Sequence, residues 1–300
     1  MTTSYTTHAI NGLLKAPDGI FDFGFRERII SGMMEAVKFR LPLNAELVTN
    51  PVEVHENLAK AYRLPFPKIV AEYETELKSQ RENEPDITSG YKVVTYAEDL
   101  GNLKQAMKGF GFNNYQWDTE GYLLYSIVES GAGFWVPSYF AAIVPYDQEG
   151  IPALKIGRSK IGMHCFAISQ SLAAKVQAAG QGFSHAEMAN EMWLDSCAIL
   201  NIALCSMCEN VEHEVVQQPK SLNKSRIKKG KTPFYEYRVL KVKGHEAYSG
   251  GGEGKKRSGV RLHMRRGHIR RLNSGGLTWV RHTIVGDKTR GVIMKDYDLS

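Results

Sequence analysis

The chain has 300 residues, of which 43% are hydrophobic and 23% charged, with a formal net charge of +6. This composition allows a substantial core and excludes a wholly disordered protein. The first residues lack the basic and apolar stretches of a signal peptide, and the longest apolar runs, 134–145 and 199–207, are too short to span a bilayer. We therefore predict a soluble, cytoplasmic protein without membrane contacts.

Helical periodicity predicts two helices near the start of the chain. Apolar residues recur at helical spacing between Phe25 and Phe39, and Asn50-Pro51 is a typical beginning for a helix that runs to Tyr62. The next run, 68–73, fits either a strand or the start of a helix, and the prolines beside it favour a strand. Further runs rich in aromatic and β-branched residues predict strands at 91–96, 122–128, 134–144 and 153–156.

A long helix is predicted over about 184–208. Ser184 and Glu187 form a capping box, and an apolar run without a breaker follows as far as Cys208. At ~1.5 Å per residue this helix would be about 37 Å long. It is apolar on nearly every side between Ile199 and Met207, which predicts a central buried helix, and 211–216 predicts a strand after it. The fold class is therefore α+β.

The four cysteines are predicted to be reduced thiols, because the chain lacks a secretory signal. Cys205 and Cys208, with His213 nearby, have the spacing of zinc ligands, but a structural site needs four ligands. Cys197 lies two helical turns before Cys205, too far away to complete a tetrahedron, so a further ligand would have to come from Cys165 or His164. We predict buried, inert thiols, no metal and no cofactor.

Charge is distributed unevenly along the chain. From Gln217 to the end there are 21 lysine and arginine residues against 6 aspartate and glutamate residues, whereas the remainder has 17 against 26. The two parts thus carry net charges of +15 and −9. This asymmetry predicts an α+β body over 1–216, a basic linker or arm over 217–232, and a basic, antiparallel β-rich domain over 233–300. Residues 234–242 predict a strand, and 249–258 a flexible glycine-rich loop.

Residues 259–297 have the pattern of a β-meander, with three apolar-alternating runs separated by turn-rich gaps. In the first run the apolar and basic residues alternate, and a bulge at Arg266-Gly267 would restore that alternation beyond the glycine. One face of a single ribbon would then carry five basic side chains, Arg261, His263, Arg265, His268 and Arg270.

The C-terminal pattern HMRRGHIRRL…WVR…VGD…RGVIMKDY resembles the C-terminal block of a family of phage and prophage proteins of unassigned function. Members share an RLHxxRGH-like strand, an aromatic-rich second strand and a final GVVxKDY-like strand. The segment 222–242 and the element Leu64-Pro65-Phe66-Pro67 also resemble that family. The resemblance implies a viral accessory protein in the cytoplasm of a host cell, and it implies no particular activity.

The basic C-terminal part predicts binding to DNA or RNA, because like charges crowded on one ribbon repel each other unless an anionic partner is present. An alternative is that oppositely charged parts of one fold attract each other. The predicted nucleic-acid-binding residues are Lys255, Lys256, Arg257, Arg261, His263, Arg265, Arg266, Arg270, Arg271 and Arg281.

Two histidines give a second hypothesis, a metal-independent ribonuclease. A hairpin centred on Gly275 would place His268 opposite His282, with β-carbons roughly 5 Å apart. One imidazole could act as base on the 2′-hydroxyl and the other as acid, with Arg270 and Arg281 beside them. A third hypothesis is an inhibitor that contacts a host protein through the acidic body. The sequence predicts no oligomeric state.

Overall fold

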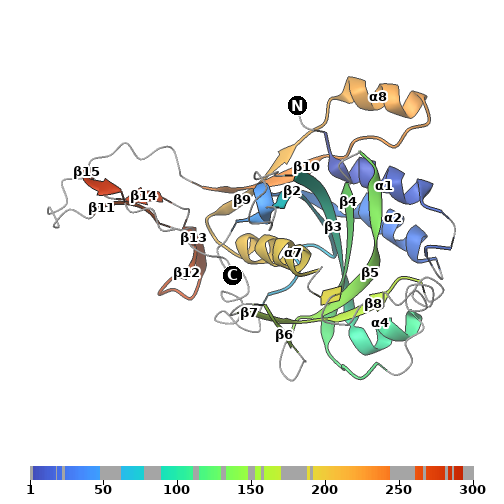
Figure 1. Cartoon of the computed structure of the whole chain (residues 1–300), viewed down its shortest axis with the longest axis horizontal. Helices are drawn as coiled ribbons and strands as arrows, with labels where there is room; N and C mark the ends of the chain where they lie inside the picture. Colours follow the sequence, from blue (N-terminus) through green and yellow to red (C-terminus); the bar gives the residue numbers. More distant parts are fainter. Residues whose placement is uncertain are drawn as a thin grey trace, which may run out of the picture.

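The computed structural model describes residues 3–17, 19–21, 24–47, 62–77, 89–110, 115–129, 133–147, 153–156, 159–169, 188–189, 192–243, 261–265, 268–280, 283–285 and 287–292. The protein is α+β, as predicted, and is built around one mixed eight-stranded sheet (Figure 1). In spatial order the strands are β8 (His164–Ala167), β5 (Trp135–Pro145), β4 (Glu120–Glu129), β3 (Ser89–Asn102), β2 (Lys68–Leu77), β1 (Val37–Arg40), β10 (Tyr237–Val242) and β9 (Val211–Val216). Strand β1 pairs in parallel with both of its neighbours, and the other pairs are antiparallel.

One face of the sheet is covered by α1 (Tyr5–Lys15), α2 (Phe25–Glu35) and α4 (Leu103–Gly109). Helical spacing brings Ile29 and Met33 of α2 onto the sheet, and both side chains are fully buried. Asn102 caps the N-terminus of α4, because its side chain accepts a hydrogen bond from the Gln105 amide at 3.0 Å. A short 3-10 turn, η1 (Leu43–Ala45), follows β1.

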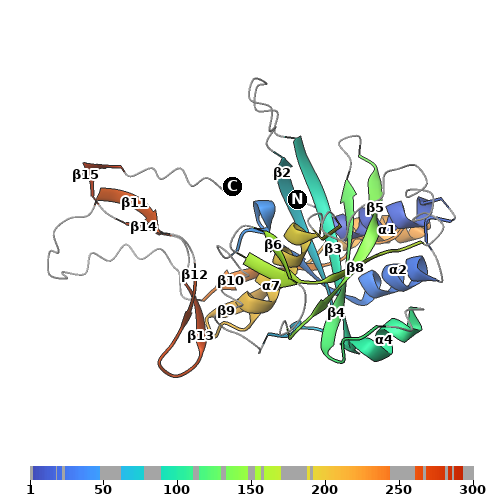
Figure 2. The same ribbon diagram turned by 60° about the horizontal axis from the view of Figure 1, so that its bottom comes forward.

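The opposite face of the sheet is covered by α7 (Trp193–Ser206), as Figure 2 shows. Every residue of α7 from Asp195 to Cys205 is buried, which confirms a central buried helix, but α7 has 14 residues and is shorter than the helix predicted over 184–208. Met188 and Ala189 are also helical, and the predicted capping box at 184–187 lies outside the described residues. The Asn201 side chain donates from Nδ2 to the Ala45 carbonyl at 2.8 Å, so α7 is also attached to η1.

Most predicted strands of the body are confirmed. The runs 91–96 and 122–128 lie within β3 and β4, 134–144 corresponds to β5, and 211–216 coincides with β9. The undecided run 68–73 is a strand, β2. The run 153–156 is β6 (Ala153–Ile156), which pairs with β7 (Ser159–Gly162) outside the main sheet. The helix predicted to begin at 50–51 lies outside the described residues except for Tyr62 at its end.

The predicted domain boundary at 217–232 is wrong. This segment contains a helix, α8 (Lys220–Lys228), and connects two neighbouring strands of the main sheet, because β10 lies between β1 and β9. Leu240 and Val242 of β10 are buried in the same core as α7. Charged residues lie mostly on the protein surface, so a change of net charge along the chain does not show where one hydrophobic core ends and another begins.

The C-terminal part contains two small sheets. Strand β11 (Arg261–Arg265) pairs with β14 (Thr283–Val285) and β15 (Asp287–Val292), whereas β12 (His268–Arg271) and β13 (Leu277–Val280) form a separate hairpin. The predicted single ribbon through 261–270 is therefore wrong, since its two halves belong to different sheets. Figure 1 shows the three-stranded sheet beyond the hairpin, away from the main sheet.

Candidate functional site

The β12–β13 hairpin is attached to the body by an asparagine. The side chain of Asn210 donates to the Trp279 carbonyl at 2.9 Å and accepts from the Trp279 amide at 2.8 Å, so it pairs with β13 as a strand would. The Glu209 amide donates to the Leu277 carbonyl at 2.9 Å. Leu277 and Trp279 are 8% and 7% exposed and belong to the main core. Strand β13 of the hairpin is therefore held against the body by hydrogen bonds and by its buried side chains.

The turn of this hairpin sets a register different from the predicted one. The Gly275 amide donates to the Leu272 carbonyl and the Leu272 amide donates to the Gly276 carbonyl, while Gly275 has φ of 89°. These features define a three-residue loop with a left-handed glycine at its last position. The loop is centred on Ser274 instead of Gly275, so His268 pairs with Val280.

The predicted pairing of His268 with His282 is therefore wrong. His282 lies outside the described residues, and the position opposite His268 is occupied by valine. The geometric basis of the proposed acid–base pair is lost with the register.

The predicted alternation along β12 matches the observed register. Ile269 is opposite the buried Trp279 and packs against the main core. His268 and Arg270 occupy the alternate positions of the strand. Arg270 and Arg271 are exposed at the end of the hairpin. They are the two predicted nucleic-acid-binding arginines that lie on the β12–β13 hairpin, which is attached to the body.

The other predicted residues fall into two groups. Arg261, His263 and Arg265 lie on β11, where His263 pairs with Val285 and Arg265 with Thr283. The remaining ones lie outside the described residues: Lys255, Lys256, Arg257, Arg266, Arg281 and His282.

Helix α8 was missed by the sequence argument, which assigned 217–232 to a linker or arm. The helix ends in a Schellman motif, in which the Lys231 amide donates to the Arg226 carbonyl at 3.0 Å and the Gly230 amide to the Ile227 carbonyl at 2.9 Å. Gly230 has φ of 65°, a conformation that favours glycine. Pro219 before the helix and Gly230 after it were the available signals.

Helix α8 is attached to the body by a second asparagine. The Asn223 side chain donates to the Phe234 carbonyl and accepts from the Phe234 amide, both at 2.8 Å. The Arg226 guanidinium donates to the Thr232 carbonyl at 2.8 Å and lies 4.1 Å from the centre of the Phe234 ring. The Pro233 carbonyl accepts from Thr7 of α1. The helix is thus held without ion pairs among its described neighbours.

Three lysines form a row on the exposed side of α8. Lys220, Lys224 and Lys228 follow each other at four-residue spacing, and all three are exposed. Four residues of helix rise about 6 Å, so the row is a line of positive charges about 12 Å long. Like charges at this spacing destabilise an isolated helix. Helix α8 lies apart from the β12–β13 hairpin in Figure 1.

Basic residues of the body are used differently, because many of them pair with carboxylates. Arg40 pairs with the buried Glu72 at 2.7 Å. Other pairs join Arg28 to Glu98, Arg63 to Glu120, Lys68 to Glu35 and Lys92 to Glu129. In the described part of the chain after Gln217, Lys241 pairs with Glu214, and none of the cations of α8, nor Arg270 or Arg271, forms an ion pair.

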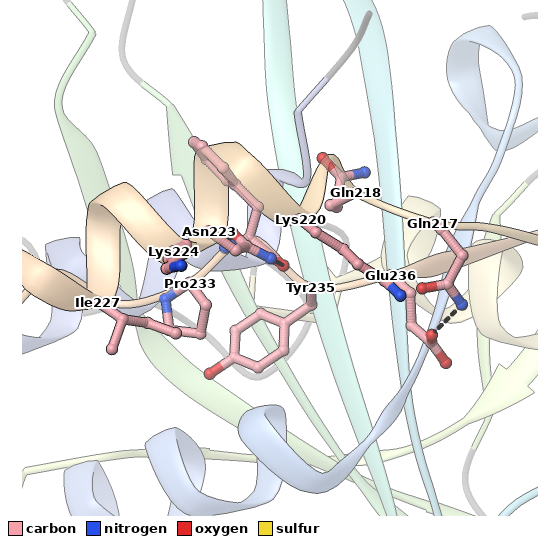
Figure 3. Close-up of a pocket in the computed structure, with 10 residues that line it drawn as sticks. Gln217, Gln218, Lys220, Asn223, Lys224, Ile227, Pro233, Tyr235 and Glu236 are labelled. Carbon is pink, nitrogen blue, oxygen red and sulfur yellow. Dashed lines mark hydrogen bonds between the residues drawn. The ribbon is translucent and has the colours of Figure 1, made fainter.

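A groove of about 530 Å³ runs between α8 and the segment 233–236 (Figure 3). Lys220, Lys224 and Ile227 line it on the helix side, and Pro233 and Tyr235 line it on the other. Ile227 is 62% exposed, an unusual position for a large apolar side chain. At one end of the groove the Glu236 carboxylate accepts a hydrogen bond from Gln217 at 2.5 Å.

Behind Tyr235 lies a buried lysine. The Lys38 ammonium is 4.2 Å from the centre of the Tyr235 ring and donates to the Met34 carbonyl at 2.8 Å. Burial lowers the pKa of Lys38 to about 8, against the opposing effect of Glu72 and Glu236. Lys38 therefore supports one wall of the groove from inside the fold.

The cysteines are buried, and burial raises the pKa of Cys165, Cys197 and Cys208 to about 12. His213 lies with its Nε2 atom 3.3 Å from the Ser206 hydroxyl, and burial lowers its pKa. Within the described residues, no three histidine, cysteine or acidic side chains are grouped to hold a metal ion. No helix in the same residues is long and apolar enough to cross a membrane.

Comparison of the chain with models of protein families, with curated proteins and with solved structures gave no match.

Proposed function

We propose that the protein binds a nucleic acid, DNA or RNA, through exposed basic residues that follow Gln217. The observation that supports this function best is the difference in charge pairing. Body cations such as Arg28, Arg40 and Lys92 have carboxylate partners, whereas Arg270, Arg271 and the α8 lysines have none among the described residues. Unpaired like charges repel each other, and the phosphates of a nucleic acid offset that repulsion.

The hairpin supplies the best-defined contact of this kind. Arg270 and Arg271 stand on β12, whose partner strand is held by Asn210 and by the buried Trp279. Arginine donates several hydrogen bonds in a fixed plane and suits phosphate oxygens. Contacts of this type position a nucleic acid without reading its sequence. The proposal therefore implies binding with little sequence preference at this element.

The biological setting is part of the same proposal. The resemblance of 222–242 and 259–297 to phage proteins supports an accessory role in a host cell, with a host protein as a further possible partner. Ribonuclease chemistry is not proposed, because the structure pairs His268 with Val280.

The salt dependence of binding tests the function. If about six phosphates are neutralised, a plot of log affinity against log salt concentration should have a slope of about −4 to −5. The double variant Arg270→Ala, Arg271→Ala should make the slope less negative by about 2. The matched control is Lys104→Ala, Lys108→Ala, two exposed lysines at four-residue spacing on α4 of the body. A flat salt response of the wild type, or equal loss in the control, would contradict the proposal.

A further inference from the structure

We propose that α8 and its groove form a second nucleic-acid contact, separate from the hairpin, that takes a single strand. The phosphates would lie along Lys220, Lys224 and Lys228, and a base would enter the groove against Ile227 and Tyr235. This inference rests on the proposed function and adds to it a second site and the form of nucleic acid that the site accepts.

The lysine row is not needed to hold α8 in place. The helix is attached through Asn223 and Arg226 and is ended by its C-terminal Schellman motif, and none of the three lysines takes part in these hydrogen bonds. The arrangement places equal charges on successive turns, where they repel each other. A row of this kind suits a ligand with regularly repeated negative charges, and a nucleic-acid backbone is such a ligand.

The groove beside the row favours a single strand over a duplex. Its walls include Ile227, Pro233 and Tyr235, so an apolar surface lies directly beside the lysines (Figure 3). A duplex presents phosphates on its outside and keeps its bases stacked inside, which would leave Ile227 without an apolar partner. A single strand presents phosphates and uncovered bases together, and bases bind to apolar and aromatic surfaces with little sequence preference.

One acidic residue opposes this contact. Glu236 lines the groove at the end where Gln217 holds its carboxylate, and it would repel a phosphate placed there. Replacing Glu236 with glutamine keeps an acceptor for Gln217 and removes the charge. If a strand occupies the groove, Glu236→Gln should therefore bind more tightly than the wild type.

The experiment compares a labelled single-stranded oligonucleotide of mixed sequence with the duplex of the same sequence, by fluorescence anisotropy at several salt concentrations. The triple variant Lys220→Ala, Lys224→Ala, Lys228→Ala should bind the single strand at least about tenfold more weakly, with a slope less negative by about 2. Ile227→Ala should weaken binding of the single strand and leave binding of the duplex unchanged. Leu222→Ala is its matched control, because Leu222 is 39% exposed on the same helix and does not line the groove.

The outcomes separate the two proposals. If the wild type binds neither form, the proposed function fails. If the wild type binds but the lysine triple variant equals the Lys104→Ala, Lys108→Ala control, the α8 site is refuted and the function stands. If the triple variant loses affinity for the single strand and for the duplex equally, and Ile227→Ala changes neither affinity, the preference for a single strand is refuted. Unchanged affinity of Glu236→Gln for the single strand would refute occupation of the groove.

Discussion

The body and the two basic elements, α8 and the β12–β13 hairpin, use polar groups for different purposes. In the body, charge stabilises the fold: the carboxylate of Glu72 is completely buried and accepts five hydrogen bonds, from Ser4, Thr6 and Arg40. In the basic elements, two neutral asparagines make corresponding attachments, and on α8 the Arg226 guanidinium adds a hydrogen bond to the Thr232 carbonyl. Asn210 pairs with the backbone of Trp279 and Asn223 with that of Phe234, in the same two-bond geometry. The three lysines of the α8 row and Arg270 and Arg271 of the hairpin take no part in these attachments, which leaves them available for a ligand.

This comparison predicts that removing a body cation damages the fold most. Arg40→Met would leave the buried Glu72 without its cation, and breaking a buried pair from one side costs about 3–5 kcal/mol of unfolding free energy. Urea unfolding measures the loss. The control is Arg63→Ala, whose partner Glu120 is exposed, and it should cost less than about 1 kcal/mol. Equal losses of unfolding free energy in the two variants would show that the Arg40–Glu72 pair does not stabilise the body more than an exposed pair does.

Lys38 predicts how the stability of the body depends on pH. Its folded pKa of about 8 lies below its ordinary value of 10.5, so above pH 8 the unfolded chain binds more protons at this residue. The contribution of Lys38 to stability therefore rises with pH between about 8 and 10.5, by up to about 3 kcal/mol.

The measurement is the stability of the wild type minus that of Lys38→Met in urea at pH 7.5 and pH 10. Subtraction is needed because the buried thiols act in the opposite direction: their raised pKa values lower stability as pH rises above 9. The difference between the two proteins should increase with pH. A difference that is constant or falls with pH would show that Lys38 stays charged in the fold.

The two asparagines predict intermediate effects. Asn210→Leu and Asn223→Leu would each leave one backbone amide and one carbonyl without a partner, which costs about 1–3 kcal/mol per variant. Asn210→Leu should also weaken the contribution of Arg270 and Arg271 to nucleic-acid binding, because β13, which pairs with the strand that carries these arginines, is then held less firmly against the body. The control is Asn273→Ala at the exposed turn of the hairpin, which should change stability little. Equal stability of all three variants would contradict the attachment described here.

The sequence predicted local periodicity well and pairing poorly. Runs rich in aromatic and β-branched residues gave most strands of the body, and alternation gave the pattern around Ile269, because each of these strands carries its own pattern. Strand β1 was missed, since Val37–Arg40 lies in a run that was predicted to be helical as far as Phe39. The place of β10 beside β1 depends on residues as distant as Phe39 and Arg238, and their pairing leaves no local signal. The register of the hairpin depends on which loop residue adopts the left-handed conformation. A loop centred on Gly275 would pair His268 with His282, whereas the observed loop, centred on Ser274, pairs it with Val280.

Helix α8 escaped prediction for a related reason. Its nine residues include only two large apolar side chains, Leu222 and Ile227, and both are exposed. An amphipathic stripe was therefore absent, and the lysines suggested a polar linker. The groove depends on Pro233 and Tyr235, which follow the helix and pack beside it in space. The sequence shows an excess of positive charge after Gln217, but the predicted linker or arm over 217–232 did not identify α8 as the element that carries the lysine row.

The smallest predicted effect on stability is also the sharpest contrast with Arg40. Replacing Lys224 by glutamine removes the middle charge of the α8 row. It thereby removes the repulsion of Lys224 with Lys220 and with Lys228, each of which destabilises the helix by about 0.2–0.5 kcal/mol. Glutamine favours helices about as well as lysine, so Lys224→Gln should leave the unfolding free energy unchanged or raise it slightly. Single-strand affinity should fall in the same variant, with a salt slope less negative by about 0.7. Paired urea and anisotropy measurements check both. A variant that lost stability would show that Lys224 serves the fold, and α8 would then belong with the body.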